Sequence, residues 1–125
     1  MDAEEIDQSI EYFVVYSMLV NAARHHGLAT YQEIAQAVAL PISGSQMGLK
    51  PGKLLRTISG NEKKQGRPML SCIAVSVNNK PSSNFYKWAR NLGFLREGED
   101  EETFWHNECK KVYDVWKIKY WRSKT

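Results

Sequence analysis

The chain has 125 residues, of which 42% are hydrophobic and 25% charged, and its formal net charge is +3. This length suits one domain with a single core, and the ordinary composition excludes a disordered or collagen-like chain. Two cysteines are too few for a disulfide framework, and with no signal peptide or membrane-length apolar stretch we expect a soluble cytoplasmic protein.

The first half of the chain predicts three helices. Residues 3–26 place apolar side chains at helical spacing. The expected inner stripe is Ile6, Ile10, Phe13, Ser17 and Val20, widened by Val14, Leu19, Ala22 and Ala23. Thr30-Tyr31-Gln32-Glu33 matches a capping box, which predicts a second helix over residues 30–39. A Gly- and Ser-rich turn over 41–48 precedes a third helix, expected over 51–59 and ending near Gly60. Its buried residues should be Leu54, Leu55 and Ile58.

The second half predicts one strand and two helices. The β-branched, apolar stretch "RPMLSCIAVSV" predicts a strand over 69–77, paired with a segment near 40–47 or after Asn79. Ser82 or Ser83 should cap a fourth helix that ends at Gly93. The acidic stretch 97–102 opens a last helix, whose packing stripe is Trp105, Cys109, Val112 and Trp116. We therefore expect a mostly helical single domain over residues 1–125. Its centre should be helix-turn-helix or winged-helix-like, with one short strand and flanking N- and C-terminal helices.

The stretch "TYQEIAQAVALP" resembles the T-Y-G-E-[IL]-A opening of the DNA-binding domain of O6-alkylguanine-DNA alkyltransferases and alkyltransferase-like proteins. The matching residues are Thr30, Tyr31, Glu33, Ile34 and Ala35, and Gln32 replaces the usual glycine. The resemblance covers about residues 28–93 and implies a winged-helix domain that binds DNA. It also implies that Tyr31 presses on the phosphate of the target nucleotide.

The chain departs from this family at the reactive cysteine. The family carries its alkyl acceptor in P-C-H-R, whereas here Cys72 lies in Leu70-Ser71-Cys72-Ile73-Ala74, without a histidine or arginine beside it. An apolar setting raises a thiol's pKa and weakens it as a nucleophile. The family's base-replacing arginine is also missing, since Ser45 stands near that position. We therefore expect Cys72 to be a core residue and alkyl transfer to be disfavoured.

No other pattern in the chain predicts catalysis, a metal or a cofactor. His106 and Cys109 lie three residues apart on one helix, but a structural zinc site needs four ligands, usually in two pairs. The sequence has no phosphate-binding glycine loop and no nucleophile elbow. A non-enzymatic binding module is the remaining interpretation.

The distribution of charge suggests what such a module binds. Residues 1–11 and 97–102 each carry five acids and no base, whereas 50–67 and 110–124 each carry six bases and one acid. In a helix-turn-helix the second helix enters a DNA groove, and a basic loop before the strand would clamp phosphates like a wing. The residues predicted to contact nucleic acid are Tyr31, Ser45, Gln46, Lys50, Lys53, Arg56, Thr57, Lys63, Lys64 and Arg67.

Two alternatives stay open at this point. The bases could be a solvated surface without a ligand. The chain could instead dock on a partner protein, with the acidic stretches recognising a basic partner. The pattern "RPMLSCIAVSV…F…A…LG" is also similar to stretches in uncharacterised bacterial and phage domains, some found near nuclease or defence genes. The sequence does not indicate the oligomeric state, the target sequence, or a preference for DNA over RNA.

Overall fold

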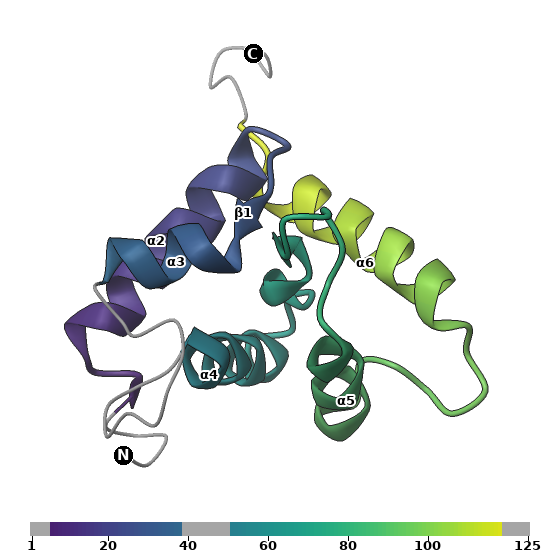
Figure 1. The fold of residues 1–125 in the computed structure, drawn as a ribbon. Helices are drawn as coiled ribbons and strands as arrows, with labels where there is room; N and C mark the ends of the chain where they lie inside the picture. Colours follow the sequence, from purple (N-terminus) through teal and green to yellow (C-terminus); the bar gives the residue numbers. More distant parts are fainter. Residues whose placement is uncertain (1–5, 39–50, 119–125) are drawn as a thin grey trace, which may run out of the picture.

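A computed structural model describes residues 6–38 and 51–118. The helices are α2 (Ile10–Arg24), α3 (Tyr31–Ala37), α4 (Pro51–Lys64), α5 (Ser83–Leu92) and α6 (Glu101–Trp116). Between them lie strand β1 (Ala29–Thr30), the 3-10 helix η1 (Leu70–Ile73) and strand β2 (Ala74–Val75). The predicted mostly helical fold is confirmed (Figure 1).

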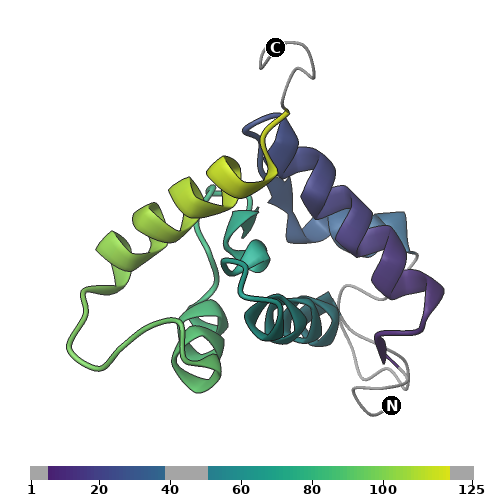
Figure 2. The same ribbon diagram turned by 180° about the vertical axis from the view of Figure 1, so that it is seen from behind.

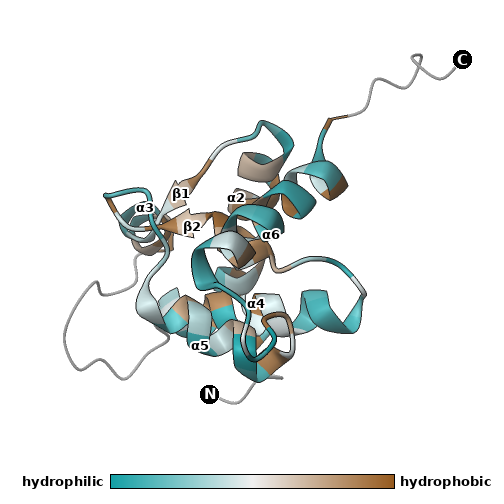
Figure 3. Ribbon diagram, turned by 90° about the vertical axis from the view of Figure 1, so that its right-hand side faces the viewer, coloured by the Kyte–Doolittle hydropathy of each residue, from teal (hydrophilic) through white to brown (hydrophobic). Residues whose placement is uncertain are grey.

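The segment formed by η1 and β2 is the centre of the fold. The helices α2, α4 and α6 all contact η1, and both views of the ribbon show them arranged around it (Figures 1 and 2). Residues 70–75 are all buried. The β1–β2 sheet is coloured hydrophobic, whereas most of the α6 ribbon is hydrophilic (Figure 3). The core therefore forms around this segment, and the long helices expose polar faces.

The predicted strand over 69–77 is wrong in its extent and in its pairing. Only Ala74 and Val75 are extended within the central segment, and they pair in parallel with Ala29 and Thr30. Among the described residues the strand partner is thus β1 and not the segment after Asn79, and the turn at 40–47 lies outside the described residues. A run that is buried on every side has no alternation in hydrophobicity, so its pattern cannot distinguish a strand from a compact turn. A parallel pair also needs a long crossover, which here contains α3 and α4.

The predicted inner face of the first helix is right at Ile6, Leu19 and Ala23 and wrong at Ile10 and Phe13. The helix begins at Ile10, because the Ser9 hydroxyl caps it by accepting a hydrogen bond from the Tyr12 amide at 3.1 Å. Its buried residues are Tyr12, Val15, Leu19 and Ala23. Ile10 and Phe13 are 77% and 59% exposed. More than half of the residues of this helix are apolar, so helical spacing alone allows more than one stripe.

The third helix extends beyond Gly60, where the sequence predicted its end. It continues to Lys64 and is closed by Gly66, which has a φ of 74°. The Gly66 amide donates to the Lys63 carbonyl at 3.1 Å, and the Arg67 amide donates to the Glu62 carbonyl at 2.9 Å. This pair of bonds is a Schellman motif. Lys63 and Lys64 therefore belong to the last turn of α4, and the predicted wing-like loop does not contain them.

The last two helices begin close to the predicted positions, and α5 ends at the predicted glycine. Ser82 is the N-cap of α5, and Gly93 ends this helix with a φ of 88°. Asp100 caps α6 by accepting a hydrogen bond from the Thr103 amide at 2.9 Å. In α6, Val112 is buried as expected, and the other stripe residues, Trp105, Cys109 and Trp116, pack half-buried against the core.

Candidate nucleic-acid interface

The outer face of α4 carries most of the predicted contact residues that the structure describes. Leu54, Leu55 and Ile58 are buried, as the sequence predicted. On the opposite side Lys53 and Arg56 are exposed and Thr57 is half-buried. Lys63 and Lys64 are exposed in the last turn. The amphipathic pattern of the helix thus separates a core side from a basic side.

A groove of about 590 Å³ runs beside this basic face, between α4 and α5. The α4 residues that line it include Lys53, Arg56, Thr57, Asn61, Lys63 and Lys64, and Asn91 lines it from α5. No acidic residue belongs to its described lining. Four cationic and two amide side chains therefore face one hollow, which is a surface suited to an anion.

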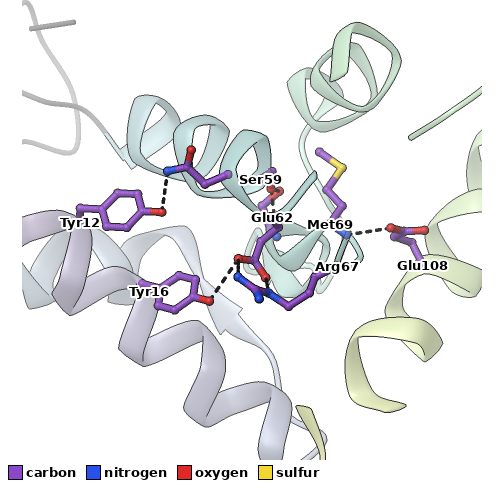
Figure 4. Close-up of polar contacts among 9 residues, drawn as sticks. Tyr12, Tyr16, Ser59, Glu62, Arg67, Met69 and Glu108 are labelled. Carbon is purple, nitrogen blue, oxygen red and sulfur yellow. Dashed lines mark hydrogen bonds and ion pairs between the residues drawn. The ribbon is translucent and has the colours of Figure 1, made fainter. Parts of the chain in front are cut away.

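The acid of α4 points away from this groove, into the core. Glu62 is 1% exposed and accepts hydrogen bonds from Arg67 Nε at 2.8 Å and Arg67 Nη2 at 2.9 Å (Figure 4). The Tyr16 hydroxyl donates a third bond to the same carboxylate at 3.1 Å. Burial, and then the Glu62 charge, raise the pKa of Tyr16 to about 12. The negative charge is therefore compensated internally and leaves the outer surface of α4 basic.

Arg67 is a correction to the predicted contact set. Its guanidinium holds Glu62 through two hydrogen bonds, and this pairing raises the pKa of Arg67 above its ordinary value. The same group lies 5.6 Å from the centre of the Trp116 ring. Because both contacts are structural, Arg67 anchors the end of α4, and the predicted role as a wing-like phosphate clamp is not supported by its geometry.

Tyr31 lies apart from the groove. Its hydroxyl accepts a hydrogen bond from the Ser82 amide at 3.0 Å, and the side chain is half-buried. It lines a different hollow of about 420 Å³, together with Pro51 and Val77. The structure therefore brings Lys53, Arg56, Thr57, Lys63 and Lys64 together but does not add Tyr31 to them. The predicted contacts Ser45, Gln46 and Lys50 lie outside the described residues.

Two residues of the groove were missed by the sequence analysis. Asn61 donates to the Tyr12 hydroxyl at 3.0 Å, and Asn91 comes from α5, thirty positions later in the chain. Asn61 follows Gly60, the predicted end of the helix, so the sequence predicts a loop position for it. Asn91 lines the groove because α5 packs on α4, and this packing cannot be predicted from the spacing of residues within either helix.

Cys72 lies in the core, as predicted. It is 0% exposed, and burial raises the pKa of its thiol well above the ordinary value, with the neighbouring Cys109 adding to the shift. Its carbonyl accepts hydrogen bonds from Trp105 Nε1 at 2.8 Å and from Cys109 Sγ at 3.6 Å. A neutral, inaccessible thiol is a poor nucleophile, so the arrangement supports a packing role.

Within residues 6–38 and 51–118, no three His, Cys, Asp or Glu side chains gather closely enough to hold a metal ion. None of the described helices has the length and apolar character needed to cross a membrane. The resemblance to the alkyltransferase DNA-binding domain stays a prediction. Comparison of the chain with family models, curated proteins and solved structures finds no match.

Proposed function

We propose that this chain binds nucleic acid without catalysing a reaction, and that duplex DNA contacts the basic face of α4 and the adjoining groove. One observation carries the proposal. Residues 51–96 contain nine bases and a single acid, Glu62, and this acid is buried in an ion pair. The surface formed by α4 and α5 is therefore basic, and its charge is not balanced by a carboxylate from the same segment.

The arrangement of the bases favours a polymer of phosphates over a single small anion. Lys53 and Lys64 are eleven residues apart on one helix, which separates them by about 17 Å along its axis. Phosphates of one DNA strand are about 3.4 Å apart along the duplex axis, so the row corresponds to roughly five base pairs. Among the described residues, no carboxylate lies within 4.0 Å of the side-chain nitrogens of Lys53, Arg56 or Lys64.

The proposal is tested by reversing Lys53, Arg56 and Lys64 to Glu and measuring affinity for a random 20-base-pair duplex by fluorescence anisotropy. The matched control reverses Arg24, Lys87 and Lys117, which are also exposed and do not line the groove. Both variants lower the formal net charge by the same amount. We expect the α4 variant to lose binding and the control to retain most of it, with unchanged helical circular dichroism in both.

Equal weakening of the two variants would mean that attraction is diffuse and that α4 forms no site. A parent chain that does not bind duplex DNA at physiological salt would contradict the proposal as a whole. The second candidate function, docking on a protein, would then be favoured. Its support is the exposure of Ile10 and Phe13, two large apolar side chains that lie three residues apart on α2 and are therefore neighbours on its surface.

A further inference from the structure

The basic groove does not end at the last turn of α4. A second hollow of about 370 Å³ continues from it and is lined by Lys63, Arg67, Arg96 and Lys111. A third hollow of about 460 Å³ follows, lined by Arg96, Lys110 and Lys111. Lys63 borders both the groove and the second hollow, while Arg96 and Lys111 border the second and the third. The three hollows form one continuous surface from α4 to α6.

Lys63 is held in a defined position where the groove meets the second hollow. Its Nζ donates a hydrogen bond to the Gly93 carbonyl at 3.1 Å and lies 4.8 Å from the centre of the Phe94 ring. These contacts fix the charge between α4 and the turn after α5. They also cover one face of the aromatic ring, so this part of the surface offers positive charge where a base could otherwise stack.

The two acids that border these hollows are held by groups of the protein. Glu108 is 3% exposed and accepts a hydrogen bond from the Met69 amide at 2.8 Å (Figure 4). Glu99 accepts one from the Arg96 amide at 2.7 Å. Lys111 Nζ is 3.8 Å from Glu108, a loose pairing, and no carboxylate of the described residues lies within 4.0 Å of the Arg96 guanidinium. Glu108 is the one acid in the described lining of the second hollow, and because it is buried, positive charge dominates the accessible part of that hollow.

We propose that the hollow between Lys63, Arg96 and Lys111 is a second phosphate-binding site, which takes a phosphodiester group of the same nucleic acid that contacts α4. This inference rests on the proposed function and extends it, because it assigns part of the contact to α6 and to the turn after α5. It predicts that full affinity requires a duplex longer than the one that α4 alone would cover.

The test compares Arg96→Gln/Lys111→Gln with the control Lys87→Gln/Lys117→Gln, which removes equal charge from positions outside the three hollows. Affinity is measured against salt with two probes, a random 20-base-pair duplex and a hairpin with a six-base-pair stem. The stem is roughly 20 Å long at about 3.4 Å per base pair, close to the length of the α4 row.

For the long duplex we expect the Arg96/Lys111 variant to bind roughly tenfold more weakly or worse. The log–log salt slope should fall in magnitude by about 0.9, since the site contributes one phosphate contact. The hairpin should bind this variant and the parent equally, and the control should match the parent with both probes. Thermal melting of each variant shows whether its fold is retained.

The outcomes separate the two proposals. If the parent binds neither probe, the proposed function is wrong and this inference is wrong with it. If the parent binds but the Arg96/Lys111 variant is unaffected on the long duplex, only the second site is wrong. Equal weakening on both probes would show that Arg96 and Lys111 act through the general field, which also contradicts a second site. Inorganic phosphate at matched ionic strength should not displace the long duplex; displacement would identify a site for the free anion.

Discussion

Helices α4 and α6 both contact the central segment and both expose a polar face. They differ in the sign of the charge at their N-termini, which is negative in α6 and positive in α4. The N-cap of α6 is Asp100, and Glu101 and Glu102 follow in its first turn, where the helix dipole favours anions. The first turn of α4 has no acid and contains Lys53, whose charge the same dipole disfavours. The acid that α4 does have, Glu62, is buried.

This difference separates charges that stabilise a helix from charges that need another explanation. The acidic start of α6 is explained by helix stability. Lys63 and Lys64 lie in the last turn of α4, where cations are favourable, so helix stability accounts for them as well. Lys53 has no such explanation. A residue that works against its own helix is expected where the surface serves a ligand, here an anion.

The largest expected effect concerns the buried acid. Glu62→Gln should destabilise the protein by about 3 kcal/mol, because it leaves the Arg67 guanidinium without its charged partner. The side chain of Arg67 is 35% exposed, which places the loss at the lower end for a buried pair. The urea midpoint measures it. The control Glu97→Gln, at an exposed position, should change the free energy of unfolding by less than about 0.5 kcal/mol. Equal midpoints for the two variants would contradict the structural role of Glu62.

A smaller effect is expected for the tyrosine that binds the same carboxylate. Tyr16→Phe removes one hydrogen bond to Glu62 and should cost about 1 kcal/mol at neutral pH.

The same substitution should also change the alkaline stability profile. Because the folded chain holds the pKa of Tyr16 at about 12, above its ordinary value of 10.0, its contribution is fully present below pH 10 and is lost as pH rises towards 12. The variant should lose less stability than the parent over this range, as urea midpoints at several pH values would show. Burial also raises the pKa of Tyr113 to about 12, so part of the alkaline loss should persist. Parallel profiles for the two proteins would contradict this account of Tyr16.

The smallest expected effect has opposite signs for stability and binding. Lys53→Glu places an anion in the first turn of α4 and should stabilise the fold by about 0.5 kcal/mol. The same change should weaken DNA binding severalfold, because it reverses one charge of the groove. Thermal melting and anisotropy on the same sample measure both. A variant that is less stable than the parent, or that binds DNA as well as the parent, would contradict the claim that Lys53 serves binding at the expense of helix stability.

Local signals in the sequence were sufficient for several elements. The capping box at Thr30 correctly predicted the start of α3, and both of its hydrogen bonds are present. The buried residues Leu54, Leu55 and Ile58 followed from helical spacing. These signals act within four residues of one another, so they do not depend on the rest of the fold.

What the sequence could not supply depends on contacts between distant segments. The helix terminator is Gly66 and not Gly60, because α4 stays packed on η1 and closes with the Schellman motif. The pairing of β2 with β1 joins residues 45 positions apart. In the sequence Arg67 does not differ from the other bases of its cluster, because its ion pair with the buried Glu62 exists only in the folded chain. The contributions of Asn91, Arg96 and Lys111 likewise require the packed arrangement of α4, α5 and α6.

The central claim is that α4 presents its bases to nucleic acid, and lysine protection tests it most directly, without any substitution. The chain is labelled with an amine-reactive reagent in the presence and absence of a saturating random duplex, and each lysine is quantified by mass spectrometry. We predict severalfold protection of Lys53 and Lys64, with Lys87 and Lys117 unchanged, since these two lie outside the groove and its continuation. Equal protection of all four lysines, or protection confined to Lys87 and Lys117, would contradict the claim.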